Sequence, residues 1–306
     1  MPDLSLQLEA VMRYHERTKH HFARFAPGPG QLDWANQPDP FRRFEGAPLT
    51  RLPLLAPGDE PRAPAYDSLY VPGAVASAAW DLRALSRLLE YALALSAWKQ
   101  AGGTRWALRV NPSSGNLHPT EGYVLAGGSA GLGEAPGLFH YAPREHALER
   151  RADCPPELYA RLMRGFPPQA FLVGLSSVYW REAWKYGERA FRYCQHDAGH
   201  AIGTLRIAAA TLGWSALVLD EVADETIEAL LGLDRSADFE NAERENAELL
   251  MALWPGKAAG TDAKLEPDAV RELARQRWYG KANRLSAEDP VRWDAIDEVS
   301  AASRKP

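Results

Sequence analysis

The spacing of apolar residues predicts several amphipathic helices along the chain. At the start, Leu4 and Leu8 recur at the spacing of one helix face. A second helix is expected to begin at Asp81, a good N-cap, and to stop at Gly102-Gly103. The pattern as a whole predicts helices over 4–24, 81–101, 184–212 and 222–231, a short helix after Pro155-Pro156, and one helix followed by a polar tail within 267–306.

Short apolar runs between these helices predict strands. The run AFLVGLSSV at 170–178 has the length and composition of a buried strand, and 137–151 resembles a hairpin closed over Pro143 to His146. Further strands are expected over 122–127 and 214–219, and an apolar run at 249–254 completes the alternation. Because helices and strands mix without a regular βαβ rhythm, we expect an α+β fold rather than a doubly wound parallel sheet.

A change in composition divides the chain into three parts. Ten of the 23 prolines lie between Pro27 and Pro72, so that segment should be extended and wrap over a surface. Its aromatic residues argue against a disordered linker. We therefore predict an N-terminal helix and proline-rich wrapping segment (1–80), a central domain (81–255), and a C-terminal helix and tail (256–306).

The overall composition excludes some classes of function. The net charge is −5, so no basic field attracts nucleic acid or an acidic membrane. No apolar run approaches the roughly 20 residues needed to span a bilayer. The two cysteines fit no disulfide framework or metal spacing, and the first ten residues lack the features of a signal peptide. We expect a cytoplasmic protein that acts on neither nucleic acid nor membranes.

A polar stretch, RVNPSSGNLHPTEGYV, directly precedes the strand at 122–127. It places Arg109, Ser113, Ser114 and Asn116 beside Pro112 and a glycine, where the backbone cannot be helical. Two interpretations are open: a tight polar turn between two elements, or a cradle for a polar, planar ligand. Neither a Gly-x-Gly-x-x-Gly motif nor a Gly-Lys-Ser phosphate loop is present.

A second group of charged residues opens the predicted helix at 184–212. Lys185 and Tyr186 precede two arginines, and His196 and His200 lie four residues apart on one helix face. The histidines resemble a zinc pair, but Asp197 stands where hydrolytic zinc motifs have Glu, and no third ligand is evident. We expect no metal site, and the alternative for the basic residues is a solvated helix face.

Together, the two stretches resemble a known family. R-x-N-P-S-S-G-N-L-H-P-T-E-x-Y-V is similar to the flavin-binding segment of the nitroreductase superfamily, and most similar to its branch of SagB-like and thiazole/oxazole peptide dehydrogenases. K-Y-G-E-R-A-x-R-Y, with D-A-G-H-A and A-A-x-x-L-G-W after it, is similar to the second signature of that branch. The resemblance covers about residues 80–255 and implies a central, mostly antiparallel sheet flanked by helices, dimeric and FMN-dependent.

The resemblance also implies roles for individual residues. Pro112, Ser113, Ser114 and Asn116 would contact FMN at a dimer interface, and Arg109 would meet the phosphate or the N1/O2 edge of the flavin ring. Lys185 and Tyr186 match the pair that the peptide dehydrogenases use around removal of the substrate proton. The backbone at 217–220 would lie near flavin N5.

The sequence departs from the family at the expected phosphate site. The Arg-Arg-Ser-x-Arg motif of many nitroreductases is missing, and Lys257 and Arg284 are the substitutes that we nominate. The proline-rich segment resembles a lineage in which two such halves occur in one longer chain, so the partner would be a second copy or a second half. The implied activity is two-electron ping-pong oxidoreduction of an azoline peptide or a nitro or quinone compound. The alternative is a non-catalytic subunit of the same fold that binds a peptide or a catalytic partner.

Overall fold

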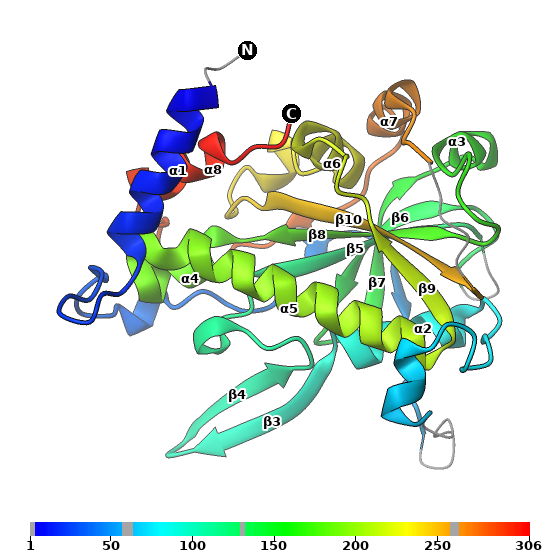
Figure 1. Ribbon diagram of the computed structural model, residues 1–306, viewed down its shortest axis with the longest axis horizontal. Helices are drawn as coiled ribbons and strands as arrows, with labels where there is room; N and C mark the ends of the chain where they lie inside the picture. Colours follow the sequence, from blue (N-terminus) through cyan, green and yellow to red (C-terminus); the bar gives the residue numbers. More distant parts are fainter. Residues whose placement is uncertain (1–3, 57–63, 129–131, 258–262) are drawn as a thin grey trace.

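The computed structural model describes residues 4–56, 64–128, 132–257 and 263–306. They form three layers, with a central sheet between two layers of helices (Figure 1). The sheet has seven strands in the order β2-β7-β6-β5-β8-β10-β9, and every neighbouring pair is antiparallel. The strands are β2 (Leu49–Arg51), β5 (Thr120–Ala126), β6 (Gly137–Ala142), β7 (Ala147–Asp153), β8 (Phe171–Ser177), β9 (Trp214–Val218) and β10 (Asn246–Pro255). The expected α+β fold with an antiparallel sheet is confirmed.

Helices cover both faces of this sheet, which is why its central strands are apolar on both sides. Val124 and Val173 pack on one face against α2 (Leu82–Ala92) and the long helix α5 (Ala190–Thr211). Leu125 and Leu172 pack on the other face. The helices of that second face are α3 (Pro156–Leu162), α6 (Asp224–Leu231) and α7 (Pro267–Ala274).

The two ends of the chain pack against each other beside the sheet (Figure 1). Helix α1 (Leu4–Thr18) ends earlier than the predicted 24, and α8 (Asp294–Ala302) lies where the sequence predicted a polar tail. Tyr14 of α1 is buried with Ala295 and Val299 of α8. Within the described ranges, no helix is long and apolar enough to cross a membrane.

The predicted helix over 81–101 is wrong in its second half. Asp81 does cap α2, since its Oδ1 accepts from the Ala84 N–H at 2.7 Å, but the helix ends at residue 92. Residues beyond it form β3 (Leu95–Ala101), which pairs with β4 (Thr104–Arg109) in a separate hairpin. Gly102 and Gly103 both have positive φ, which a two-residue hairpin turn requires. The glycine pair therefore closes a hairpin rather than a helix.

The predicted helix over 184–212 is interrupted. Helix α4 (Tyr179–Tyr186) begins earlier, and Gly187 separates it from α5 with a φ of 53°. A Cβ at Gly187 would stand 3.0 Å from the Trp293 ring, so space as well as backbone favours glycine. Lys185 therefore lies in the last turn of α4, where the helix dipole favours a cation, and not at a helix start.

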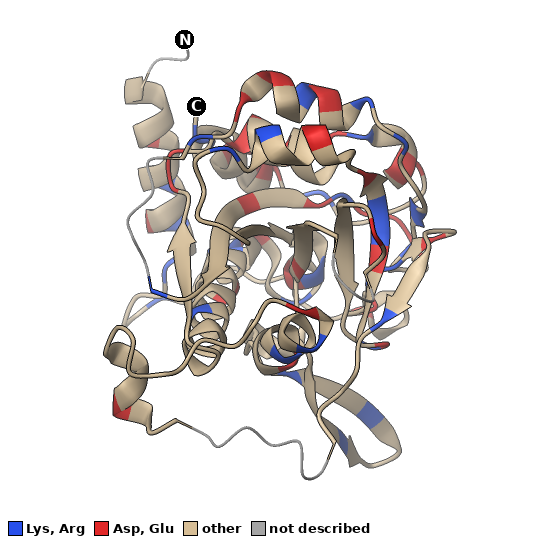
Figure 2. Ribbon diagram, turned by 90° about the vertical axis from the view of Figure 1, so that its right-hand side faces the viewer, with Lys and Arg blue, Asp and Glu red and all other residues tan. Residues whose placement is uncertain are grey.

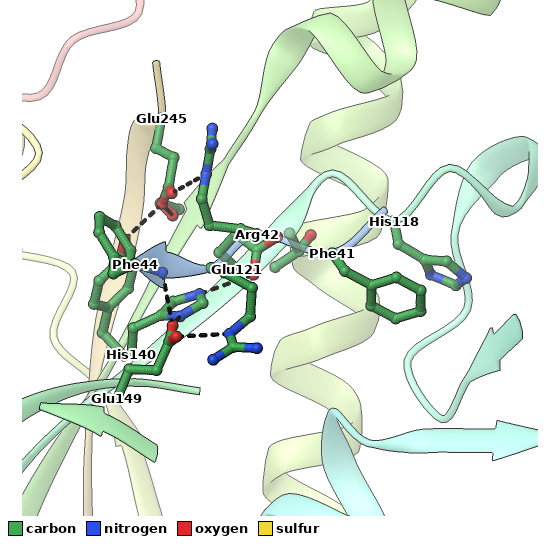
Figure 3. Close-up of polar contacts among 12 residues, drawn as sticks. Phe41, Arg42, Phe44, His118, Glu121, His140, Glu149 and Glu245 are labelled. Carbon is green, nitrogen blue, oxygen red and sulfur yellow. Dashed lines mark hydrogen bonds and ion pairs between the residues drawn. The ribbon is translucent and has the colours of Figure 1, made fainter. Parts of the chain in front are cut away.

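The proline-rich segment follows the surface of the chain's own sheet. Its short strand β1 (Phe44–Glu45) pairs with β11 (Lys281–Ala282), and β2 extends the main sheet. Just before β1, Arg42 is fully buried, and its Nε donates to Glu245 Oε1 at 3.1 Å (Figure 3). Residues 57–63 of the segment lie outside the described residues. The predicted extended course is observed in the described part.

Candidate functional site

The polar stretch forms the loop between β4 and β5, and its side chains fix the shape of that loop. Gly115, Asn116 and His118 have φ angles of 62°, 61° and 52°, so the chain turns tightly through left-handed conformations. Asn116 Nδ2 donates to the Ala107 carbonyl at 2.8 Å, and Asn116 Oδ1 pairs with His118 Nε2 at 2.9 Å. The His118 N–H donates to Ser113 Oγ at 2.7 Å. A rigid, polar loop results.

Arg109 stands behind this loop. Its guanidinium donates to the carbonyl oxygens of Thr120 and Pro40 and lies over the Phe41 ring. Burial lowers the pKa of Arg109 to about 10. The side chain thus joins the loop to the proline-rich segment, and its contact with a flavin stays a prediction.

The structure brings the two sequence motifs together at Gly115. A Cβ built on Gly115 would lie 2.6 Å from Tyr186 Oη and 3.0 Å from Lys185 Nζ, so glycine permits their close approach. The Tyr186 ring packs on Tyr193 with centroids 4.4 Å apart. Burial, with the nearby Glu182 carboxyl, raises the pKa of Tyr186 to about 12. At neutral pH this phenol keeps its proton.

A pair of buried carboxyl groups lies beneath the loop, and the sequence analysis did not single it out. Asp197 Oδ1 and Oδ2 accept from the Ser114 N–H at 3.0 and 3.1 Å, and Ser114 Oγ also donates to Oδ1. Glu182 is fully buried, accepts from Ser113 Oγ at 3.4 Å, and has one oxygen without a hydrogen-bond partner among the described residues. Burial and the neighbouring Asp197 raise the pKa of Glu182 well above its usual range. Burial raises the pKa of Asp197 as well, but the hydrogen bonds from Ser113 and Ser114 lower it, so the protonated form is favoured more at Glu182 than at Asp197.

The buried guanidinium of Arg181 connects helix α4 with the sheet and the loop. Arg181 of α4 pairs with Glu121 of β5 and donates to the carbonyls of His118, at the end of the loop, and Asp39. Glu121 also pairs with His140 at 3.1 Å, and His140 bonds Glu149 at 2.9 Å (Figure 3). Burial opposes the charge on His140, but the two glutamates raise its pKa to about 9.

A cavity of about 800 Å³ lies along α5, about one helical turn beyond the residues Asp197 and His200 that bond the loop. Gly203, Arg206 and Ala210 of α5 form one wall, and Lys257 stands at the end of β10. The remaining walls are residues 68–73 and 75–77 of the N-terminal segment and residues 213–216 at the start of β9. Neither Arg206 nor Lys257 pairs with a carboxylate in the described part of the chain. This is the size and donor set of a ligand site.

The predicted site residues thus fall into two groups on one side of α5. Lys257 lines the cavity, whereas none of residues 112–116 does. His200 Nδ1 bonds the Pro112 carbonyl at 3.1 Å, which places the loop beside the cavity along the helix. Arg284 bonds Ser286 and Asp289 and does not line the cavity.

The histidine pair does not assemble a metal centre in the described ranges, where no group of three or more His, Cys, Asp and Glu could hold an ion. His200 bonds the loop as described, and His196 packs near the Tyr193 ring.

The chain belongs to the nitroreductase family, whose model matches residues 81–242. Members of this family generally use a flavin, and membership indicates an oxidoreductase. A nitroreductase-family protein of Methanocaldococcus jannaschii is 28% identical over 126 residues, which is 39% of this chain and 62% of that protein. The present chain therefore spans less than two thirds of this relative's length.

A solved structure shares the fold over most of this chain. The crystal structure of a nitroreductase-family protein of Anabaena variabilis has a TM-score of 0.59 at 25% identity and covers 89% of this chain and 55% of its own. A family member of Ralstonia eutropha has a TM-score of 0.48 at 18% identity, covering 76% and 98% of the two chains. The E. coli microcin synthetase McbBCD complex with truncated pro-MccB17 has a TM-score of 0.45 at 18% identity, covering 84% and 95%.

The buried carboxyl pair yields a pH-dependent prediction. The folded-state pKa of Glu182 is raised, so the contribution of this group to stability falls as pH rises above the ordinary value of 4.5. Glu182→Gln mimics the protonated carboxyl, so its stability relative to the wild type should grow over that range. Asp197→Ala should instead cost about 1–3 kcal/mol, because it leaves the Ser114 N–H without its acceptor.

Urea unfolding between pH 4 and 8 measures both effects. If Glu182→Gln is destabilising and more so at high pH, Glu182 is ionised in the folded protein and the assignment is wrong.

Proposed function

We propose that this protein is an FMN-dependent oxidoreductase of the SagB-like, peptide-dehydrogenase type. The observation that carries the proposal is the 800 Å³ cavity with two cations, Arg206 and Lys257, that lack carboxylate partners among the described residues. Beside it, on the same helix, lies the loop in which Gly115 meets Lys185 and Tyr186. Family membership supports the flavin, and the residues of the cavity support a phosphorylated one.

The cavity fits a flavin mononucleotide. Arg206 and Lys257 supply positive charge for a phosphate, in place of the family's missing arginine motif. An added Cβ at Gly203 would meet no atom within 4 Å, so this wall leaves room for a planar ring. Strand β9 is the last strand of the sheet, and its outer backbone groups are free of a strand partner in the described chain. They provide donors and acceptors for the heteroatoms of the ring.

A second copy, or a second nitroreductase-like half, is proposed to complete the site. The loop that the family resemblance assigns to the flavin does not line the cavity of its own chain, although both lie on one side of α5. Two copies that pack α5 against α5 would bring the loop of one to the cavity of the other. The exposed Gly199 on this helix permits close packing.

Lys185 and Tyr186 are proposed to handle the substrate proton. Bound FMN would accept the hydride of a substrate such as an azoline peptide. Tyr186 Oη and Lys185 Nζ both adjoin Gly115. The proton released from carbon would pass to the neutral amine of Lys185, and Tyr186, which keeps its own proton, would orient the substrate by donating a hydrogen bond. The protonated Glu182 below them limits the negative charge in the site.

A phosphate-specific loss of affinity tests the cavity. Arg206→Gln combined with Lys257→Gln should weaken FMN binding by about 1.5–3 kcal/mol per charged hydrogen bond lost. Riboflavin, which has the ring but no phosphate, should bind both proteins alike. Titration of the apoprotein with each flavin, followed by fluorescence quenching, measures the difference.

A matched control for this experiment is Lys264→Gln, which removes an exposed lysine paired with Glu221 outside the cavity. Equal weakening of FMN and riboflavin would refute the phosphate site. A wild type that takes up no flavin at all would favour the non-catalytic subunit.

The proton-handling pair is tested separately. Lys185→Ala and Tyr186→Phe should leave FMN content intact and slow flavin reduction by an azoline-containing peptide about 10²–10⁴-fold, the scale of a general base. Reduction by NADH, which needs no abstraction of a carbon-bound proton by the protein, should change little. Stopped-flow bleaching of the flavin band measures both rates. Full rates with the peptide in both variants, or no reduction of the wild type by the peptide, would contradict the proposed chemistry.

A further inference from the structure

A second cavity, of about 540 Å³, lies at the base of the β3–β4 hairpin, away from the proposed flavin cavity. The hairpin forms one wall, the proline-rich segment the opposite wall, and the loop between β4 and β5 one end. Its aromatic and charged side chains include Trp34, Asp39, Phe41, Trp98, Arg105 and Arg144. We call this cavity the hairpin groove.

Two aromatic rings of the hairpin groove are open to solvent, and a third, Phe41, is buried behind them. Trp34 is 67% exposed and Trp98 is 43% exposed. The Trp98 ring lies 6.4 Å from Phe41, and Trp34 packs edge-on against Trp184 at 5.2 Å. Exposed rings that face one cavity are typical of a binding surface, because each gains apolar contact when a ligand ring enters.

Two arginines give the groove a positive charge. Arg105 lies 4.3 Å over Trp98, and Arg144 lies 5.5 Å from the Phe41 ring. Neither pairs with a carboxylate among the described residues. Asp39 is the acidic side chain of the groove, and its Oδ1 accepts from the Phe41 N–H. The cations therefore outnumber the anion.

The charge of the hairpin contrasts with the rest of the chain. Residues 91–120, which include the hairpin and the loop, contain no Asp or Glu, although the protein carries a net charge of −5. In Figure 2 the hairpin, at the bottom of the view, carries Lys and Arg and no acidic residue. A ligand with negative charge is the complement of this surface.

The groove adjoins the proposed catalytic residues. Asn116 and Leu117 line it, and they directly follow Gly115, which contacts Lys185 and Tyr186. From the other side, Trp34 contacts Trp184, the residue before Lys185. A chain bound in the groove can thus extend to the loop.

We propose that the hairpin groove binds an acidic peptide segment that carries an aromatic residue. Trp34, Phe41 and Trp98 receive the ring, and Arg105 and Arg144 pair with the carboxylates. The hairpin is a two-stranded sheet in the described structure, so its outer edges can also add an extended peptide strand. That this peptide is the substrate rests on the proposed function, whereas the binding itself does not.

Binding of a fluorescent, end-blocked peptide with two aspartates flanking a phenylalanine tests the proposal. The flavin-free protein is used, so failure here is distinct from failure of flavin binding. We expect saturable binding that weakens with salt, and an affinity about tenfold lower when asparagines replace the aspartates. Arg105→Gln with Arg144→Gln should abolish that preference for aspartate.

Lys99→Gln is the matched control. It removes one positive charge from the same hairpin, but strand alternation places Lys99 on the opposite face from Trp98. Its affinity for the peptide should stay within about twofold of the wild type. Three results would overturn the proposal: no saturable binding, equal binding of the asparagine peptide, or a loss in Lys99→Gln as large as in the arginine variant. Phenylpropionate binding as tightly as the peptide would overturn the assignment to a peptide.

Discussion

The site depends on one buried ion pair, between Arg181 of α4 and Glu121 of β5. Both side chains are inaccessible to water, so each charge relies on the other and on its further bonds. Arg181 also donates to the carbonyls of His118 and Asp39. One guanidinium thereby joins helix α4, the sheet, the end of the loop and the wall of the hairpin groove. Removing one partner of such a pair typically costs about 3–5 kcal/mol, because the other charge stays buried.

The position of Lys185 and Tyr186 follows from this connection. Arg181 lies one turn before them on α4, and the loop that it holds presents Gly115 to them. Asp197 of α5 holds the same loop from below through Ser114. The loop is therefore fixed by α4 on one side and α5 on the other before any ligand binds. Because the loop is already rigid, it loses little conformational entropy when a ligand binds to it.

Much of the fold could be predicted from the sequence, because strand runs and helix patterns are local signals. The Gly102-Gly103 pair indicated a helix end where the chain forms a hairpin, because glycine ends a helix and closes a hairpin equally well. The family resemblance assigned both motifs to a flavin site, whereas the contact of Gly115 with Lys185 and Tyr186 is seen only in the structure. Glu182 could have been found, because it lies three and four residues before Lys185 and Tyr186 on one helix face. Arg206 and Lys257 could not be paired in advance, since only the packing of β9 and β10 beside α5 brings them to one cavity.

We propose that one flavin site is built from the cavity of one copy and the loop of another. Co-expression of a Ser114→Trp chain and an Arg206→Glu/Lys257→Glu chain, with different affinity tags, tests it most directly. Each variant alone should bind no FMN, whereas the doubly purified mixed dimer contains one site with an intact cavity and an intact loop. We expect one FMN per mixed dimer. A mixed dimer without FMN, or a wild-type monomer that holds stoichiometric FMN, would contradict it.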